Sequence, residues 1–503
     1  MSSKKKAIAL SYVNLLMGMV VNIYLTPMLI VSLGDTDYSL YKVMHSLAGP
    51  LTMFHLGVST VVTRSIIRNK DGGNIREKQN TLALSLLASG VMALLVLIAG
   101  AVLYLAIPAM YGQTYSEASV RTGQQIFVMF VAASVLHMLT DAFSGCIMGH
   151  ERYVITSAIP LTKTTGKFVL LFVLLKCGMG VWSVVAVDLL LAAGIFLITL
   201  LYAIFGLHEM PRLYYFDKKQ LTEIVAFGLA ILLQAFVNQV NNNMDTMILG
   251  AFIDEKAVIT MYSSALTIYS IYNSLISVVT HYFLPQATKL TAQNASGREM
   301  TDFIIVPGRF QAVIALTCIF GFALFGRNFI SVWIGARYMD AWWVILMLMI
   351  PVTIPLVENA VISILDASMK RMFRSVVLVV MAVLNLMVSV VLVQWLGFWG
   401  AAVGSAASLL LGHGLLMNLY YAKVFHIEVF RMFRQIFAGI LPAGLLTSLV
   451  CLPLALFLPD TVLWFVVKCG SFVLIYAMLL CIFGLNASEK AVFGKILRKL
   501  RHK

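Results

Sequence analysis

Charged residues are scarce in this chain of 503 residues. Only 12% of the residues are Asp, Glu, Lys or Arg, while 60% are hydrophobic, and the mean hydropathy is +0.92. A water-soluble core cannot hide so much apolar surface, so the composition excludes a soluble globular protein. We therefore expect an all-α integral membrane protein.

Cysteine is also rare, and none of the six cysteines belongs to a CxxC pair, which makes a disulfide framework or a structural metal unexpected. The sequence has no G-x-x-x-x-G-K-[ST] loop, so no nucleotide site is expected. Long polar loops are missing as well, since no predicted loop is long enough to fold as a domain. Any function must therefore lie within the membrane helices.

Long apolar runs are what the sequence has instead. A bilayer core about 30 Å thick needs ~20 apolar residues for each helical crossing. Fourteen predicted spans lie at 7–33, 38–63, 81–107, 122–148, 153–175, 181–205, 221–250, 257–284, 303–325, 341–365, 376–395, 398–421, 436–456 and 461–484. The first run is too long for a signal peptide and has no convincing cleavage site, so we expect it to be a span.

Lys and Arg residues are distributed unevenly over the predicted loops. If the N-terminus is cytoplasmic, twenty-six of them lie on the cytoplasmic side, and the opposite side has only Arg121, Lys176, Lys256, Arg327 and Arg337. The positive-inside rule then places both termini in the cytoplasm. Topology and attraction to anionic membrane lipids explain the net charge of +14, and nucleic acid is not an expected partner.

The sequence aligns with itself at one constant shift, which sets Asn22 against Asn241 and Arg152 against Arg371. Six spans are followed by six more, which indicates a parallel repeat with a pseudo-twofold axis along the membrane normal. We expect an N-lobe at 1–207, a cytoplasmic linker at 208–220 and a C-lobe at 221–423. Two further spans and a basic tail would occupy 424–503.

Polar residues recur at helical spacing in four predicted spans, and in lipid such a face must turn toward protein or water. We interpret these faces as the lining of a hydrophilic cavity between the two lobes. The candidate substrate-binding residues in these spans are Asn22, Lys42, His45, Asn238, Asn241, Tyr269, Asn273 and His281. For the Ser and Gly members of the same faces, contacts that hold helices together are an equally good explanation.

Two lysines, Lys163 and Lys167, lie four residues apart near the middle of the fifth span and share one helical face. Ionisable groups at membrane depth cost at least ~2.5 kcal/mol, so they usually mark a pathway or a partner. A phosphate group would satisfy both lysines, and Lys42 and His45 could join them. The alternatives are that Lys42 reaches the membrane interface and that the span-five lysines face an acidic residue such as Asp141.

Several short motifs follow one another in a characteristic order. They are Pro27, Leu33-Gly34, Tyr41, Leu56-Gly57, Arg64, the stretch from Gly149 to Tyr153, the stretch from Asp245 to Gly250, the stretch from Ala367 to Lys370, Asn385, and the stretch from Gly397 to Ala402. Together they resemble the polysaccharide-repeat-unit flippases of the multidrug/oligosaccharidyl-lipid/polysaccharide (MOP) exporter superfamily. The resemblance covers roughly residues 7–421.

This resemblance implies two six-helix bundles, plus two C-terminal helices, that work by alternating access. It implies an undecaprenyl-pyrophosphate-linked oligosaccharide as the substrate, moved from the inner to the outer leaflet of a bacterial cytoplasmic membrane. Capsule, O-antigen or related polysaccharide assembly would use the product, with polysaccharide polymerase machinery as a further partner. No cofactor is expected beyond a coupling ion, Na⁺ or H⁺.

Lipid II flippases of the same superfamily hold a sodium ion near spans seven, eleven and twelve. By resemblance, Asp245, Asn385 and Ser389 would form such a site here. The alternative is that Asp245 only hydrogen-bonds neighbouring helices. Those flippases also have arginine-rich first spans, where this chain has Lys42 and His45.

Two other functions remain open. A multidrug antiporter would share this fold, but it more often places carboxylates in its cavity than lysines. A lipid-sugar-dependent glycosyltransferase would use an acidic pair such as Asp35 and Asp37 to hold a metal ion. Because that loop is short, an acidic turn is the preferred interpretation, and we do not expect an enzyme.

Overall fold

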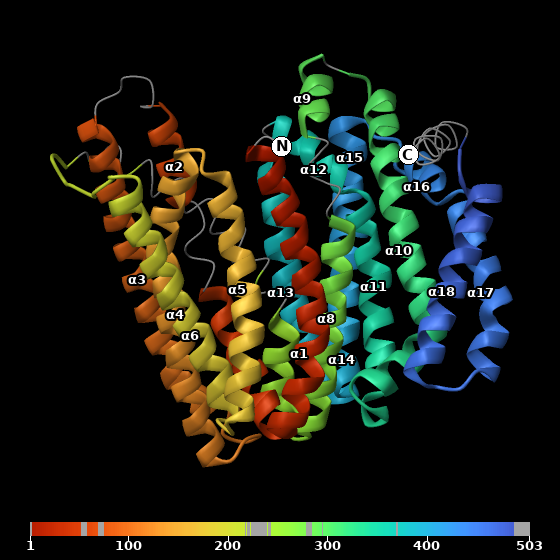
Figure 1. Cartoon of the computed structure of the whole chain (residues 1–503). Helices are drawn as coiled ribbons and strands as arrows, with labels where there is room; N and C mark the ends of the chain where they lie inside the picture. Colours follow the sequence, from red (N-terminus) through yellow and green to blue (C-terminus); the bar gives the residue numbers. More distant parts are fainter. Residues whose placement is uncertain are drawn as a thin grey trace. The chain divides into compact units, whose positions relative to one another are not determined.

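The computed structural model describes residues 3–51, 58–68, 75–216, 243–277, 284–293, 295–368 and 371–486, together with the single residues 218, 222 and 239. Every regular element in these ranges is a helix (Figure 1), which confirms the prediction of an all-helical chain. Most of the predicted seventh span, with Asn238 and Asn241, lies outside the described residues. His281 of the eighth span lies outside them too.

Ten helices of the described part are long and apolar enough to cross a membrane, or eleven if the bent pair Ala341–Val357 and Asn359–Leu365 forms one more span. Large apolar side chains point outward, among them Val31, Trp395 and Phe457, each more than 80% exposed. Lipid accommodates such side chains, whereas water does not. The chain is thus a multi-pass membrane protein, and the total of fourteen spans stays a prediction.

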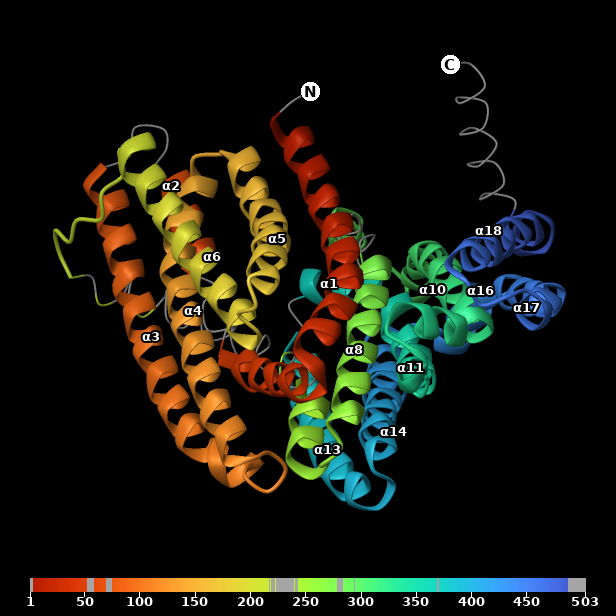
Figure 2. The same ribbon diagram turned by 60° about the horizontal axis from the view of Figure 1, so that its bottom comes forward.

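A break at Gly34 divides the first helix, α1 (Ser3–Ala48). Gly34 has φ 72° and ψ 174°, a backbone conformation that favours glycine. The apolar stretch Ala9–Leu51 has 43 residues, which as one straight helix would be about 65 Å long, roughly twice the hydrocarbon thickness. The bend, visible in Figure 2, lies between the first and second predicted spans.

The first compact unit comprises Met1–Ser263 and Val393–Phe398. Besides α1 it contains α2 (Val58–Arg68), α3 (Ile75–Tyr111), α4 (Glu117–Gly149), α5 (Tyr153–Lys176), α6 (Val181–Leu201), the π-helical turn η2 (Tyr202–Gly206) and the start of α8 (Lys256–Ser277). Helix α4 packs against α1, α2, α3, α5 and α6. Its contact with α2 depends on Gly145, because a Cβ atom there would lie 2.5 Å from the carbonyl oxygen of Ser59.

The second compact unit comprises Ser264–Leu392 and Trp399–Lys503. Its helices, after the rest of α8, are α9 (Leu284–Ala292), α10 (Gly297–Trp333), η4 (Ala336–Tyr338), α11 (Ala341–Val357), α12 (Asn359–Ala367), α13 (Arg371–Leu396), α14 (Phe398–Leu409), η5 (Leu410–Met417), α15 (Asn418–Phe425), α16 (Val429–Phe437), α17 (Ile440–Phe457), α18 (Val462–Leu479) and η6 (Leu480–Gly484). Helix α10 contacts α11, α16, α17 and α18.

Two features of the second unit differ from the sequence-based expectation. The predicted tenth span is bent by 42° between α11 and α12. Pro351 and Pro355 lie in α11, where each lacks a backbone donor and weakens the helix. The sequence also predicts a loop over 422–435, whereas the structure continues α15 to Phe425 and then forms α16.

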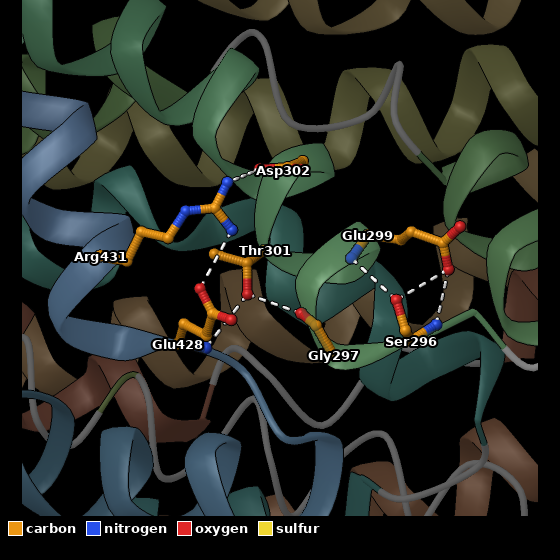
Figure 3. A network of polar contacts seen from close by, with 7 residues as sticks. All are labelled: Ser296, Gly297, Glu299, Thr301, Asp302, Glu428 and Arg431. Atoms are coloured by element: carbon orange, nitrogen blue, oxygen red, sulfur yellow. Dashed lines mark hydrogen bonds and ion pairs between the residues drawn. The ribbon is translucent and has the colours of Figure 1, made fainter.

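Polar contacts attach α16 to the start of α10 (Figure 3). Ser296 caps α10, since its Oγ accepts the Glu299 N–H at 3.3 Å while Glu299 accepts the Ser296 N–H at 2.7 Å. On α16, Arg431 lies 2.6 Å from Asp302 and 3.0 Å from Glu428. Because these ion pairs are exposed, we expect them to add little to the stability of the fold.

Candidate functional site

Polar side chains from three helices of the first unit meet inside an otherwise apolar bundle. Lys167 of α5 donates to both carboxylate oxygens of Asp188 on α6, at 2.8 and 3.1 Å. One turn away, the Nζ atom of Lys163 lies 3.0 Å from Nε2 of His137 on α4. The two lysines therefore share a face of α5, as their spacing predicts, and that face turns toward α4 and α6.

Electrostatic interactions extend this group to the second part of α1. His45 interacts with Lys42, Lys163, Lys167 and Asp188. We call the set of Lys42, His45, His137, Lys163, Lys167 and Asp188 the basic cluster. Three ammonium groups accompany one carboxylate in it, so positive charge is in excess even when both histidines are neutral.

Aromatic rings surround the α1 part of the basic cluster. The Nζ atom of Lys42 lies 5.4 Å from the ring centre of Tyr38 and 5.9 Å from that of Tyr41. His45 meets the ring of Phe130 edge-on at 5.4 Å. Cation–π contacts hold an ammonium group without neutralising it. In the described part of the chain, no carboxylate is paired with Lys42.

The basic cluster is accessible rather than sealed in a core. The Lys167 side chain is 28% exposed and that of Asp188 16%, while His45 is exposed and Lys42 is half-buried. Helix α5 itself buries only Leu171 among its 24 residues. The cluster therefore has partly exposed groups on both α1 and α5.

The polar face of the first half of α1 serves mainly to bind α5. Asn14 accepts a hydrogen bond from the Thr164 hydroxyl at 3.1 Å, and Ser11 lies 3.5 Å from Ser157. These contacts agree with the helix-holding explanation for small polar residues. The side chain of Asn22, in contrast, is exposed, so it remains a candidate for substrate binding.

Two of the predicted substrate-binding residues, Tyr269 and Asn273, are half-buried on the part of α8 that belongs to the second unit. Asn273 donates to the carbonyl oxygen of Tyr269 at 3.1 Å. Their neighbour Tyr272 is buried and hydrogen-bonds Thr353 of α11 at 2.6 Å. Tyr272 thus joins α8 to α11. The roles of Tyr269 and Asn273 in substrate binding stay predictions.

Comparison with known proteins adds to this geometry. Residues 3–291 match the sequence profile of the polysaccharide biosynthesis protein family. The chain belongs to this family. The match confirms the resemblance inferred from the short motifs, and no curated protein sequence matches the chain.

Solved structures share the fold of this family member. The lipid II flippase MurJ, in an inward closed conformation, has a TM-score of 0.73 at 13% identity, over 95% of this chain and 98% of MurJ. A multidrug resistance MATE family transporter of the MOP superfamily, facing inward, has a TM-score of 0.58 at 11% identity, over 86% of this chain and 98% of the transporter. The eukaryotic MATE transporter AtDTX14 gives 0.57 at 14% identity, over 86% and 99%. The fold is therefore that of MOP-type transporters.

The three residues of the predicted sodium site have other partners in this family member. Asp245, 3% exposed, accepts a hydrogen bond from Tyr262 at 2.6 Å. Asn385 of α13 accepts from Ser389 at 2.8 Å and donates to Ser405 of α14 at 3.1 Å. Asp245 belongs to the first unit and the other residues to the second, so the site stays a prediction.

No group of three His, Cys, Asp or Glu residues converges on a point that suits a metal ion, within the described ranges. The acidic pair proposed for a glycosyltransferase lies at the break of α1. There the carbonyl oxygen of Asp35 accepts a hydrogen bond from Thr260 at 3.5 Å. This contact agrees with the interpretation of Asp35 and Asp37 as part of a turn.

Contacts also join the loops that are predicted to lie outside the membrane. The Nζ atom of Lys256 lies 3.5 Å from the ring centre of Tyr115, and the Tyr115 hydroxyl donates to Ser39 at 3.1 Å. Thr114 donates to the carbonyl oxygen of Gly250 at 2.7 Å. Burial lowers the pKa of Lys256 to about 8, an effect that nearby Asp254 opposes. Burial likewise raises the pKa of Tyr115 to about 12.

Two members of the basic cluster were not predicted from the sequence. Lys167 has an acidic partner, as one of the alternatives held, but this partner is Asp188 and not Asp141. His137, the neighbour of Lys163, was not singled out. No fixed sequence spacing links Lys167 to Asp188 or Lys163 to His137, because these contacts depend on how neighbouring helices align. An ionisable residue in the middle of the apolar stretch 122–148 was the available signal for His137.

Proposed function

We propose that this protein is a flippase that moves an undecaprenyl-pyrophosphate-linked oligosaccharide from the inner to the outer leaflet of a bacterial cytoplasmic membrane, by alternating access, for capsule, O-antigen or related polysaccharide assembly. The observation that carries the proposal is the excess positive charge of the basic cluster. Membership of a polysaccharide biosynthesis family and the fold shared with a lipid II flippase support a lipid-linked substrate.

The pyrophosphate is the part of the substrate that the basic cluster suits. Lys42 contacts aromatic rings and Lys163 contacts a histidine, so among the described residues neither side chain is bound to a carboxylate oxygen and both can meet a phosphate oxygen. Two unit charges 4 Å apart attract by ~1 kcal/mol in water and by ~4 kcal/mol at the effective dielectric constant of a partly dehydrated site. An ammonium on a flexible chain also releases its partner readily, as transport requires.

The remaining parts of the substrate need less from the protein. The polyprenyl tail stays in lipid, and exposed amide groups such as Asn22 offer hydrogen bonds to sugar hydroxyls. Both termini would lie in the cytoplasm, with lobes at 1–207 and 221–423. Polysaccharide polymerase machinery would take over the product on the outer side.

Charge removal on α5 tests the proposal. Lys163→Ala should lower transport of the lipid-linked oligosaccharide about tenfold, which corresponds to ~1.4 kcal/mol of lost interaction. Lys167→Ala should act in the same direction. Lys176→Ala, at the exposed end of the same helix, is the matched control and should transport normally. Full complementation of a deletion strain by both cluster variants, at normal membrane levels, would reject the phosphate role.

Coupling to Na⁺ or H⁺ through Asp245, Asn385 and Ser389 is part of the proposal. Asp245→Asn should abolish the ion dependence of transport and leave the fold intact, because an amide still accepts the hydrogen bond from Tyr262. Asp254→Asn, in an exposed predicted outer loop, is the control. Unchanged ion dependence in Asp245→Asn would exclude the site.

The alternative is a cation-coupled multidrug antiporter, favoured by the fold shared with MATE transporters. Organic cations would be repelled by the excess positive charge around Lys42 and Lys163. Drug resistance on overexpression, combined with an unchanged glycan after deletion, would reverse the preference.

A further inference from the structure

A buried carboxylate in the second unit lies where the transmembrane helix is broken. Glu358 separates α11 from α12, at the 42° bend, and its side chain is only 2% exposed. A charged side chain near a helix end usually reaches the membrane surface. The burial of Glu358 excludes this explanation. Glu358 is instead directed into the protein.

Within the described ranges, one side-chain hydrogen bond holds Glu358. The amide nitrogen of Asn418, at the start of α15, donates to Oε1 of Glu358 at 2.7 Å. The same nitrogen lies 3.0 Å from the carbonyl oxygen of His413 and 3.3 Å from that of Gly414. Three acceptors around one nitrogen fix the orientation of the Asn418 amide, since its oxygen cannot take that place.

Two oxygen atoms at this place have no hydrogen-bond partner among the described residues. They are Oε2 of Glu358 and Oδ1 of Asn418, and both are fully enclosed. A buried polar atom without a partner is costly and requires an explanation, such as a group that binds there. Ionised Glu358 would need a cation or a donor at Oε2, and neutral Glu358 would carry a proton there.

Among the residues that the structure describes, the charged and titratable groups around Glu358 form no ion pair with it. Tyr421 of α15 interacts electrostatically with Glu358 and with Arg374 of α13. His413 of η5 is likewise influenced by Arg374. On α10, Arg309 donates to backbone carbonyl groups of Gln435, Ala438 and Gly484. Lys289 of α9, which packs on α12, is exposed.

The helices beside Glu358 are irregular. Residues Leu410–Met417 form the π-helical segment η5, a conformation often found at functional sites. Gly412 allows η5 to approach α13, because a Cβ atom there would overlap the side chain of Met381. A change in the charge of Glu358 would therefore act on a bent helix and on an irregular one.

From this geometry we propose that the carboxyl group of Glu358 is a proton-binding site of the second unit. Oε2 carries the proton, and Asn418 holds Oε1 in place through its donated hydrogen bond. The use of this proton to drive transport rests on the proposed function, whereas proton binding itself does not.

Infrared spectroscopy of the purified full-length protein tests the assignment. The wild type should show a protonated-carboxyl band at neutral pH that disappears as the pH rises. This band should be lost in Glu358→Gln and retained in Glu117→Gln, whose carboxylate is exposed and paired with Arg121. Asn418→Ser should keep the band and shift its titration midpoint. A band unchanged in Glu358→Gln would overturn the proposal.

Two further measurements separate the proton from its alternatives. Addition of NaCl at constant pH should leave the protonated-carboxyl band unchanged. If NaCl removed the band, the site would bind sodium, and the assignment as a proton-binding site would be wrong. In vesicles, transport by Glu358→Gln should become independent of pH while Glu117→Gln keeps the wild-type profile. If the infrared result holds and Glu358→Gln transports with the wild-type profile, the role in transport is overturned and proton binding stands.

Discussion

Asp188 restrains the basic cluster, and its replacement should have two opposite effects. In Asp188→Asn the ammonium group of Lys167 loses the carboxylate that lies 2.8 and 3.1 Å away. The fold should become less stable, because a partly buried charge is left without a counter-ion. Anion binding should become tighter, because Lys167 no longer has a competing partner.

The exposure of the pair sets the size of the first effect. Removing one partner from a fully buried pair costs ~3–5 kcal/mol, and an exposed pair is worth ~0–1 kcal/mol. With exposed fractions of 28% for Lys167 and 16% for Asp188, we expect the free energy of unfolding to fall by about 2 kcal/mol. Thermal unfolding in detergent measures this fall for the wild type and for Asp188→Asn. The double variant Asp188→Asn/Lys167→Met should regain part of the lost stability, because it no longer has the unpaired ammonium group.

Titration calorimetry with inorganic pyrophosphate measures the second effect. Asp188→Asn should bind the probe about tenfold more tightly than the wild type, which corresponds to ~1.4 kcal/mol. Lys167→Ala should bind it more weakly, and Lys176→Ala should not differ. If Asp188→Asn bound pyrophosphate no better than the wild type while Lys167→Ala was also unaffected, the basic cluster would not be an anion site.

Three further predictions concern the fold and its orientation. The pKa of Lys256 is lowered from 10.5 to about 8, so between about pH 8 and pH 10.5 the unfolded chain binds more protons than the folded one. The melting temperature should therefore rise with pH in this range. Lys256→Met should not show this rise. Gly145→Ala should destabilise the fold by ~1–3 kcal/mol through overlap with Ser59, whereas Gly194→Ala, with open space around it, should not lower the melting temperature. A membrane-impermeant thiol reagent should label Asp254→Cys from outside in a cysteine-free background and leave Lys218→Cys unlabelled; the reverse pattern would invert the topology.

The length and composition of the apolar runs predicted membrane helices, because the bilayer demands continuous hydrogen-bonded segments of a minimum length. The described residues contain ten or eleven helices long and apolar enough to cross a membrane, against fourteen predicted spans. The fifth span, predicted at 153–175, is the helix Tyr153–Lys176. The helical period likewise predicted that Lys163 and Lys167 share a face. Their partners escaped prediction because helix register in lipid is set by packing, for which one sequence gives no measure.

The burial of Glu358 also could not be predicted from the sequence. Glu358 lies within the tenth span, 341–365, which is predicted without a break, and the structure buries it at the bend that follows Pro351 and Pro355. Proline in a membrane helix signals a kink without saying which way the following residues turn. The partner Asn418 lies 60 residues further along the chain, so no local pattern connects the two.

Helix α5 differs along its length in how far its side chains are buried. One buried side chain, Leu171, anchors it, while Lys163, Thr164 and Lys167 form its polar contacts. Most other positions are half-buried, and only six of the 24 are exposed. Apolar substitutions at these six exposed positions should therefore change the surface of α5 at small cost to the bundle, which makes them the first places to vary when the helix is redesigned.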